Sequence, residues 1–173
     1  VAWLIDRYIL RRKRLVYRVQ VDAPIGVYPS TDKTQRMVDV EVRHQSAVVD
    51  NPSIVLLRLD NAGGMDIDPQ DMHEKVSFAF PDRKIVGLKV TEAQPSSLGE
   101  MLQRRLVPAN YVDTSKLVLP RIAINRGDHF KFLLVLSGTG KGVTHSGYLA
   151  GGSTGAVLMA VAQSFDLANL AML

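Results

Sequence analysis

The sequence contains no cysteine and few aromatic residues, and each absence excludes a class of protein. Without cysteine the chain can form neither a disulfide framework nor a thiolate metal site. Phenylalanine, tyrosine and tryptophan together make up 6% of the 173 residues, which is too few for a nucleic-acid surface built on base stacking. The net charge of +4 is modest. We therefore predict that the chain has no nucleic-acid partner.

The catalytic patterns that can be recognised from sequence are missing as well. Ser146 has Thr144 two residues before it, so it lacks the first glycine of a G-x-S-x-G nucleophile elbow. No pair of carboxylates at helical spacing lines a predicted cleft. The four histidines are spread over different predicted elements. The sequence therefore predicts a non-enzymatic protein with no catalytic residue and no cofactor.

Residues 137–142, Ser-Gly-Thr-Gly-Lys-Gly, follow an apolar strand and invite comparison with a phosphate-binding loop. A G-x-x-x-x-G-K-[ST] loop needs an earlier glycine five residues before its second one, and a hydroxyl residue after its lysine. Those two positions hold Val135 and Gly142. The segment is therefore predicted to be a glycine-rich hairpin turn that joins the last two strands of a sheet.

Carboxylates gather between residues 66 and 74 and raise the question of a cation site. A calcium loop takes ligands at alternate positions, with a glycine at the sixth. Counting from Asp66, the fifth position is Gln70 and the sixth is Asp71, so the pattern breaks. The weak metal candidates are Asp66, Asp68, Asp71 and His73. The segment is predicted to be a hydrated acidic loop without a metal, and a metal- or phosphate-dependent enzyme is only a remote alternative.

The first fourteen residues consist of an apolar run followed by a basic block. This order is typical of the cytoplasmic end of a membrane helix, where aromatic residues lie at the interface. Ten apolar residues alone cannot span a bilayer, which takes about 20. Residues 1–13 are therefore predicted to end a membrane-spanning or interfacial helix, with an ordinary surface helix as the alternative. The predicted lipid-facing residues are Trp3, Tyr8, Arg11, Arg12, Lys13 and Arg14.

Short apolar segments separated by turn residues fill residues 14–150. Met37–Arg43 alternates strictly, whereas Ile54–Leu59 is denser in apolar residues and is predicted to be a central strand. The other predicted strands are Leu15–Asp22, Val76–Phe80, Ile85–Glu92, Lys116–Leu119 with Ile122–Ile124, and His129–Leu136. Gly63 and Gly64 are predicted to supply the positive φ angles of a turn. About eight short strands predict a mainly β fold, an antiparallel immunoglobulin-like β-sandwich with short N-terminal and C-terminal helices.

The C-terminal segment, residues 153–173, differs in composition from the predicted sandwich. A helix over residues 155–173 would be about 28 Å long, just enough to cross a hydrocarbon core. Its polar residues Gln163, Asp166 and Asn169 recur every three positions and therefore share one side. The segment is predicted to be either a second membrane segment or an amphipathic docking helix.

Three stretches of the chain resemble a loosely described bacterial juxtamembrane β-sandwich family found especially in actinobacterial membrane proteins. They are RRKRLVYRVQVDAPI, IVLLRLDNAGGMDIDPQDMHEKVSFAF and LVLPRIAINRGDHFKFLLVLSG. In similar proteins the sandwich lies between two membrane helices, and some continue into an extracytoplasmic domain like the periplasmic phosphate-binding proteins. The resemblance implies a second span after residue 150 and no catalytic residues.

Together these features predict a membrane-tethered interaction or assembly module that lies on the cytoplasmic side. The membrane surface is the first expected partner, because anionic lipid attracts the basic block. A protein partner or a second copy of the chain is the other. The alternative is a soluble subunit of a larger assembly, in which the terminal helices are docking elements.

Overall fold

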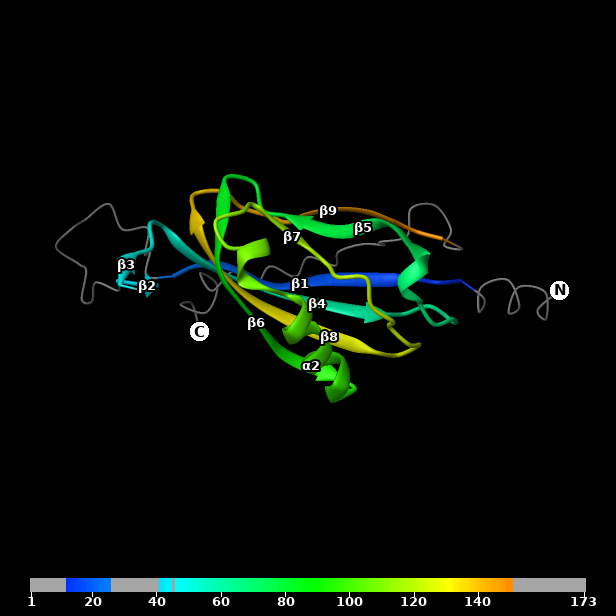
Figure 1. Cartoon of the computed structure of the whole chain (residues 1–173). Coiled ribbons are helices and arrows are strands. Elements are labelled where there is room, and N and C mark those ends of the chain that lie inside the picture. Colours follow the sequence, from blue (N-terminus) through cyan, green and yellow to red (C-terminus); the bar gives the residue numbers. More distant parts are fainter. Residues whose placement is uncertain (1–11, 26–40, 45, 151–173) are drawn as a thin grey trace, which may run out of the picture.

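The computed structural model of the chain describes residues 12–25, 41–44 and 46–150, and most of them form β-strands (Figure 1). The strands are β1 (Leu15–Pro24), β2 (Arg43–His44), β3 (Ala47–Val48), β4 (Pro52–Asn61), β5 (Met72–Ala79), β6 (Arg83–Gln94), β7 (Lys116–Val118), β8 (His129–Gly138) and β9 (Thr144–Leu149). The helical elements are α2 (Ser96–Arg105) and the 3₁₀ turns η2 (Pro69–Asp71) and η3 (Pro108–Asn110). The prediction of a mainly β, antiparallel fold is confirmed.

Two antiparallel sheets face each other across one core. The larger has the strand order β1-β4-β8-β6, the smaller β7-β5-β9, and β2 and β3 form a separate hairpin. Tyr17 of β1 packs edge-on against Phe78 of β5, with ring centroids 5.1 Å apart, which joins the two layers. Figure 1 shows the start of β1 and the end of β9 at one end of the molecule, and β2 and β3 at the other.

Strands β4 and β8 lie in the middle of the larger sheet, and in both of them burial repeats every two residues. Leu57 and Phe132 are partners in the register and are both fully buried. Their neighbours Leu56 and Leu133 also pair, but lie half-buried on the outer face. Because successive side chains point to opposite faces of a strand, each strand gives one row to the core and a second row to the outer surface.

Helix α2 covers the end of β6. Leu98 and Leu102 are buried in the core, and Gly99 allows the close approach, since an added Cβ would lie 2.9 Å from the Cβ of Ala93. In the sequence, Pro95, Ser96, Ser97 and Gly99 indicate an irregular connection, and only Met101–Leu106 predicts a short turn of helix. The helix begins five residues earlier, after Pro95, and its buried side includes Leu98 and Leu102, four positions apart.

The predicted hairpin between the last two strands is wrong. β8 belongs to the four-stranded sheet and β9 pairs with β5 in the other sheet, so residues 139–143 cross between the two layers. Asp22 holds this crossing because its Oδ2 accepts the Gly142 N–H at 3.0 Å. Gly138 and Gly140 lie directly against the backbone of the turn at Pro81–Asp82. An added Cβ would clash with the carbonyl oxygen of Asp82 at Gly138 and with that of Pro81 at Gly140.

The turn after β4 is also built differently from the prediction. Neither Gly63 nor Gly64 has a positive φ. Gly63 is needed instead for space, since an added Cβ would lie 2.6 Å from the backbone nitrogen of Arg14. Asn61, which is 2% exposed, closes the turn by accepting the Gly63 N–H and donating to the carbonyls of Met65 and Ile124.

Several predictions fall on residues that the structure does not describe. The predicted terminal helices lie outside the described residues, except that residues 12–14 run into β1 without regular secondary structure. Most of the predicted strand Met37–Arg43 lies outside as well, and its last residue begins β2. The predicted strand Ile122–Ile124 contributes only one isolated bridge, between Ile124 and Ile67.

Candidate functional site

The predicted lipid-facing residues are divided by the limits of the described chain. Trp3, Tyr8 and Arg11 lie outside it. Arg12 and Arg14 run beside the turn after β4, where their carbonyls accept the N–H groups of Gly64 at 3.1 Å and Ala62 at 3.0 Å. The basic block therefore begins to pair with the fold before β1 starts.

Lys13 forms an ion pair with Asp71, and both side chains are largely buried. The second interaction of this carboxylate is internal to η2, because the Asp68 N–H donates to Asp71 Oδ2 at 2.6 Å. The backbone carbonyl of Asp71 accepts the N–H of Ala150 at 2.8 Å. The two ends of the β domain thus meet at one residue. We call the end of the fold formed by Lys13, Asp71 and Ala150 the terminal pole.

The surroundings of Asp71 shift its acidity. Burial raises the pKa of this carboxyl, but the hydrogen bonds from Lys13 and the Asp68 N–H, together with the charges of Lys13 and His73, outweigh burial and lower the pKa below its ordinary value. A carboxylate with a depressed pKa in the folded state stabilises the fold above its unfolded pKa. That stabilisation is lost as the pH falls through the folded pKa.

Replacing Asp71 by Asn is therefore expected to flatten the acid limb of the stability profile. The unfolded carboxyl titrates near pH 3.9, so the native chain should lose stability from about pH 4 downward, while the variant loses less over the same interval. Urea unfolding at a series of pH values measures this difference. Asp66→Asn, on an exposed carboxylate at the same end of the fold, is the control, and parallel acid limbs for wild type and Asp71→Asn would contradict the role of Asp71.

The weak metal candidates are not gathered into one site. Asp66 accepts the backbone N–H of Arg126 at 2.7 Å, and Asp71 is used by Lys13 and η2. His73 is exposed and lies beside Tyr148, with ring centroids 6.5 Å apart. Within residues 12–25, 41–44 and 46–150 no group of three or more histidine or acidic side chains could hold a metal ion.

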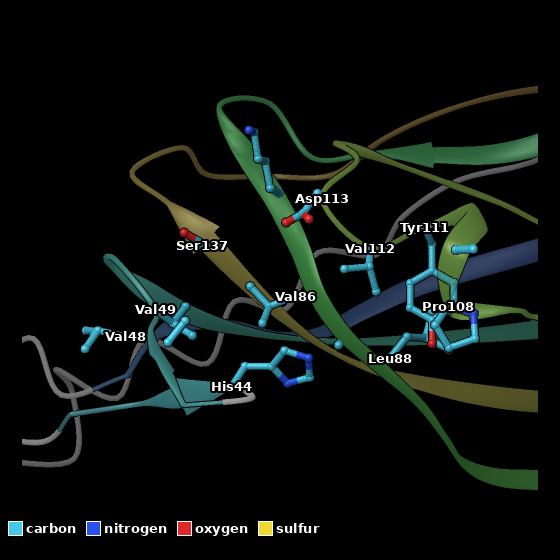
Figure 2. A pocket seen from close by; sticks show the side chains of 14 residues that line it. His44, Val48, Val49, Val86, Leu88, Pro108, Tyr111, Val112, Asp113 and Ser137 are labelled. Carbon is cyan, nitrogen blue, oxygen red and sulfur yellow. The ribbon is translucent and has the colours of Figure 1, made fainter.

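A groove of about 720 Å³ lies at the other end of the fold, around the first half of β6 (Figure 2). We call this end, marked by β2 and β3, the hairpin pole. Figure 2 shows the hairpin residues His44, Val48 and Val49 on one side of Val86, and Val112 and Tyr111 on the other. The lining residues are His44, Ala47, Val48, Val49, Lys84, Val86, Gly87, Leu88, Pro108, Ala109, Tyr111, Val112, Asp113 and Ser137. The lining is mostly apolar, as expected of a binding cleft.

A smaller hollow of about 280 Å³ continues along β6 and shares Leu88, Pro108 and Tyr111 with the groove. It adds Lys89 and Val90 from the strand and Gln103 from α2. Burial raises the pKa of the Tyr111 hydroxyl, so this ring stays neutral at physiological pH. The two hollows together are lined by residues of β6 from Lys84 to Val90.

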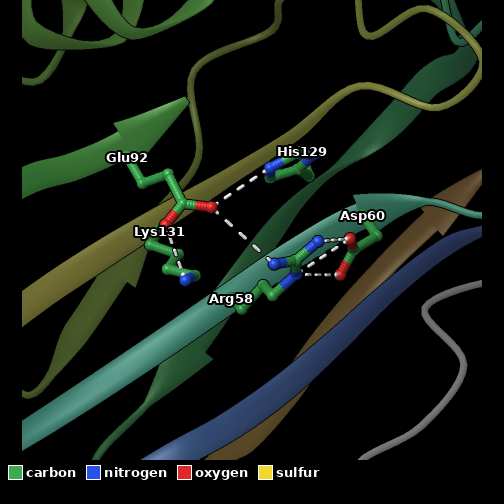
Figure 3. Close-up of polar contacts among 5 residues, drawn as sticks. All are labelled: Arg58, Asp60, Glu92, His129 and Lys131. Atoms are coloured by element: carbon green, nitrogen blue, oxygen red, sulfur yellow. Dashed lines mark hydrogen bonds and ion pairs between the residues drawn. The ribbon is translucent and has the colours of Figure 1, made fainter. Parts of the chain in front are cut away.

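A cluster of charged side chains occupies the outer face of the four-stranded sheet (Figure 3). Arg58 donates to both carboxylate oxygens of Asp60 on the same strand, from Nη2 at 2.7 Å and from Nε at 3.0 Å. Glu92 accepts from Lys131 Nζ at 2.7 Å and lies 3.2 Å from His129 Nε2. The hydrogen bond from Lys131 lowers the pKa of Glu92, and the bond to Asp60 raises the pKa of Arg58. These charges satisfy one another, so the cluster ties β4, β8 and β6 together.

No family model, curated protein or solved structure matches this chain. The resemblance to the juxtamembrane family therefore stays a prediction. In the part of the chain that the structure describes, no helix is both long enough and apolar enough to cross a bilayer.

Sequence reasoning missed the groove altogether. One signal was present, because Gly87 interrupts the strand Ile85–Glu92, and a glycine inside a strand marks a bulge or a close approach of another backbone. The alternation of Arg58 with Asp60, and of His129 with Lys131, could have placed each pair on one face of its strand. That both pairs meet Glu92 depends on strand order, which no local pattern contains.

Proposed function

We propose that the chain is a non-enzymatic protein-interaction module, an immunoglobulin-like β-sandwich held at a membrane through the segment that precedes β1. The observation that carries the proposal is the separation of its two poles. Both ends of the β domain meet at Asp71 on the terminal pole, whereas the groove described above opens at the hairpin pole.

The length of β8 gives the scale of this separation. The strand runs from His129, near the terminal pole, to Gly138 at the hairpin pole, and ten residues of strand span about 33 Å. Gly87 of the groove pairs with Val135, six residues after His129, so a domain attached at its terminal pole would present this part of the groove about 20 Å from the lipid surface. The basic residues before β1 favour the cytoplasmic side, because clustered Lys and Arg next to a membrane segment are retained there.

Lys13 of the basic block also takes part in the fold, and the test must separate this role from lipid binding. Lys13 stabilises the fold through Asp71, so it is left in place. Replacing Arg11, Arg12 and Arg14 by Ser is expected to weaken binding to vesicles that contain phosphatidylglycerol by about 100-fold, since each basic residue contributes about 1 kcal/mol near an anionic surface. Sedimentation of the full chain with vesicles measures the partition coefficient.

A matched variant removes the same charge elsewhere. Arg104, Lys116 and Lys141 are exposed and lie on α2, β7 and the crossing between the sheets, outside the segment that precedes β1. Replacing these three by Ser is expected to leave partitioning within about twofold of wild type, because charges beyond about one Debye length are screened. Equal losses in both triple variants would indicate non-specific charge attraction. A wild-type chain that does not sediment with anionic vesicles would overturn the membrane part of the proposal.

A further inference from the structure

Gly87 is a glycine that the domain itself does not require. It stands in the middle of β6, after a β-bulge that interrupts the register with β8 between Ile85 and Gly87. Its φ lies outside the left-handed region, and an added Cβ would meet no atom of the described residues within 4 Å. Neither the backbone conformation nor a neighbouring atom explains the missing side chain. Since Gly87 lines the groove, the space above it belongs to the groove.

The edge of β6 that does not face β8 is paired at only one residue among those described. There the Ile85 N–H donates to the carbonyl of Thr114, and the Ile85 carbonyl accepts the N–H of Asp113, both at 2.8 Å. Beyond Ile85 the described chain forms no other backbone ladder with β6 except that with β8. An extended backbone can therefore approach the strand at the bulge, where no side chain stands in the way.

Apolar side chains that border the groove are exposed. Val48 of the hairpin is 55% exposed, and Val107, next to the lining residue Pro108, is 47% exposed. Large apolar side chains that border a groove in this way are typical of a surface that a partner covers.

The charges along β6 favour a partner with carboxylates. Lys84 and Lys89 lie on either side of Gly87, both are exposed, and neither forms an ion pair with another described residue. Among the described residues that line the groove, Asp113 is the single carboxylate. Two cations against one anion give the site a positive balance, which selects for acidic groups in the occupant.

The geometry points to an extended segment of a partner protein that runs along β6 past Gly87. Its apolar side chains enter the groove between the hairpin and Val112, and its carboxylates lie at Lys84 and Lys89. This inference deepens the proposed function by naming the partner class, and it needs the interaction role but not the membrane attachment.

The test selects peptides from a displayed library of random short peptides on the immobilised full chain, in buffer without lipid. Wild type is expected to retain apolar peptides that carry aspartate or glutamate. Gly87→Trp fills the groove above the strand, so it should weaken binding of these peptides about tenfold or more. Thr144→Trp, at an exposed position of β9 in the other sheet, is the matched control and should bind as wild type does. Urea unfolding of all variants shows whether each one folds.

A second pair of variants tests the charge argument without adding bulk. Lys84→Glu with Lys89→Glu should weaken the acidic peptides about tenfold, while Lys75→Glu on β5 should not. The inference is overturned if no peptide is retained, or if the retained peptides bind Gly87→Trp and wild type equally. Because no vesicle is present, a failed membrane assay leaves this result standing, and a failed peptide selection leaves the membrane assay standing.

Discussion

Replacing Asp22 by Ala is expected to lower the free energy of unfolding by about 3 to 5 kcal/mol, because it leaves a buried cation without its partner. Arg83 has a side chain that is 1% exposed, and its Nη1 donates to Asp22 Oδ1 at 2.6 Å. The same guanidinium donates from Nη2 to the Gly142 carbonyl at 2.5 Å. Without the carboxylate, Arg83 loses an acceptor that water does not easily replace, and the Gly142 N–H loses its contact with β1.

Urea unfolding followed by circular dichroism gives the size of this effect. Asp22→Asn is the matched variant, since its amide oxygen can still accept one hydrogen bond, and it should lose less stability than Asp22→Ala. Arg58→Ala breaks a pair that is part-exposed, at 27% and 33% for the two side chains, and is expected to cost about 1 kcal/mol or less. If Asp22→Ala costs no more than Arg58→Ala, burial does not control the strength of these pairs.

Replacing Gly140 by Ala is expected to destabilise the fold by about 3 kcal/mol, at the upper end of the cost of overpacking. The added methyl group would clash with the backbone carbonyl of Pro81, and a backbone atom cannot move aside as a side chain can. The crossing between the sheets would have to shift, together with the Asp22 and Arg83 contacts that hold it. Thermal and urea unfolding measure the loss.

Comparing Gly140→Ala with Gly142→Ala separates two reasons why alanine destabilises a glycine position, steric overlap and a left-handed backbone conformation. Gly142 has a φ of 82° but no atom within 4 Å of an added Cβ, so alanine there meets only the cost of the left-handed conformation, about 1 to 2 kcal/mol. We expect Gly140→Ala to be the more harmful of the two. The opposite order would mean that residues 139–143 adapt their path, and that the close packing on Pro81 is not what requires glycine.

The strands of this protein could be predicted because their signal is local. β4 and β8 contain dense runs of apolar residues, which predict strands, and in both of them burial repeats every two residues. The crossing from β8 to β9 could not be predicted in this way. A hairpin and a sheet-to-sheet connection both need glycine, and only the pairing of β9 with β5, together with the contacts of Asp22, distinguishes them.

The site residues show the same limit. The basic block and the acidic segment were each recognised from sequence and were interpreted separately. The basic block was predicted to face lipid, and the acidic segment was predicted to be a hydrated loop. Lys13 and Asp71 join them across 58 residues of sequence, and charge pattern alone does not specify such a contact. The groove depends on the return of residues 108–113 beside β6, which follows from the length and packing of α2 rather than from any motif.

The meeting of both ends of the β domain at Asp71 also has a mechanical consequence. A domain whose entry and exit points are adjacent can be inserted into a longer chain without moving the two flanking segments apart. A pull applied between those segments acts first on the Lys13–Asp71 contact and the Ala150 hydrogen bond. The groove, at the far end of the strands, would keep its shape until tension had peeled β1 or β9 away from its neighbour.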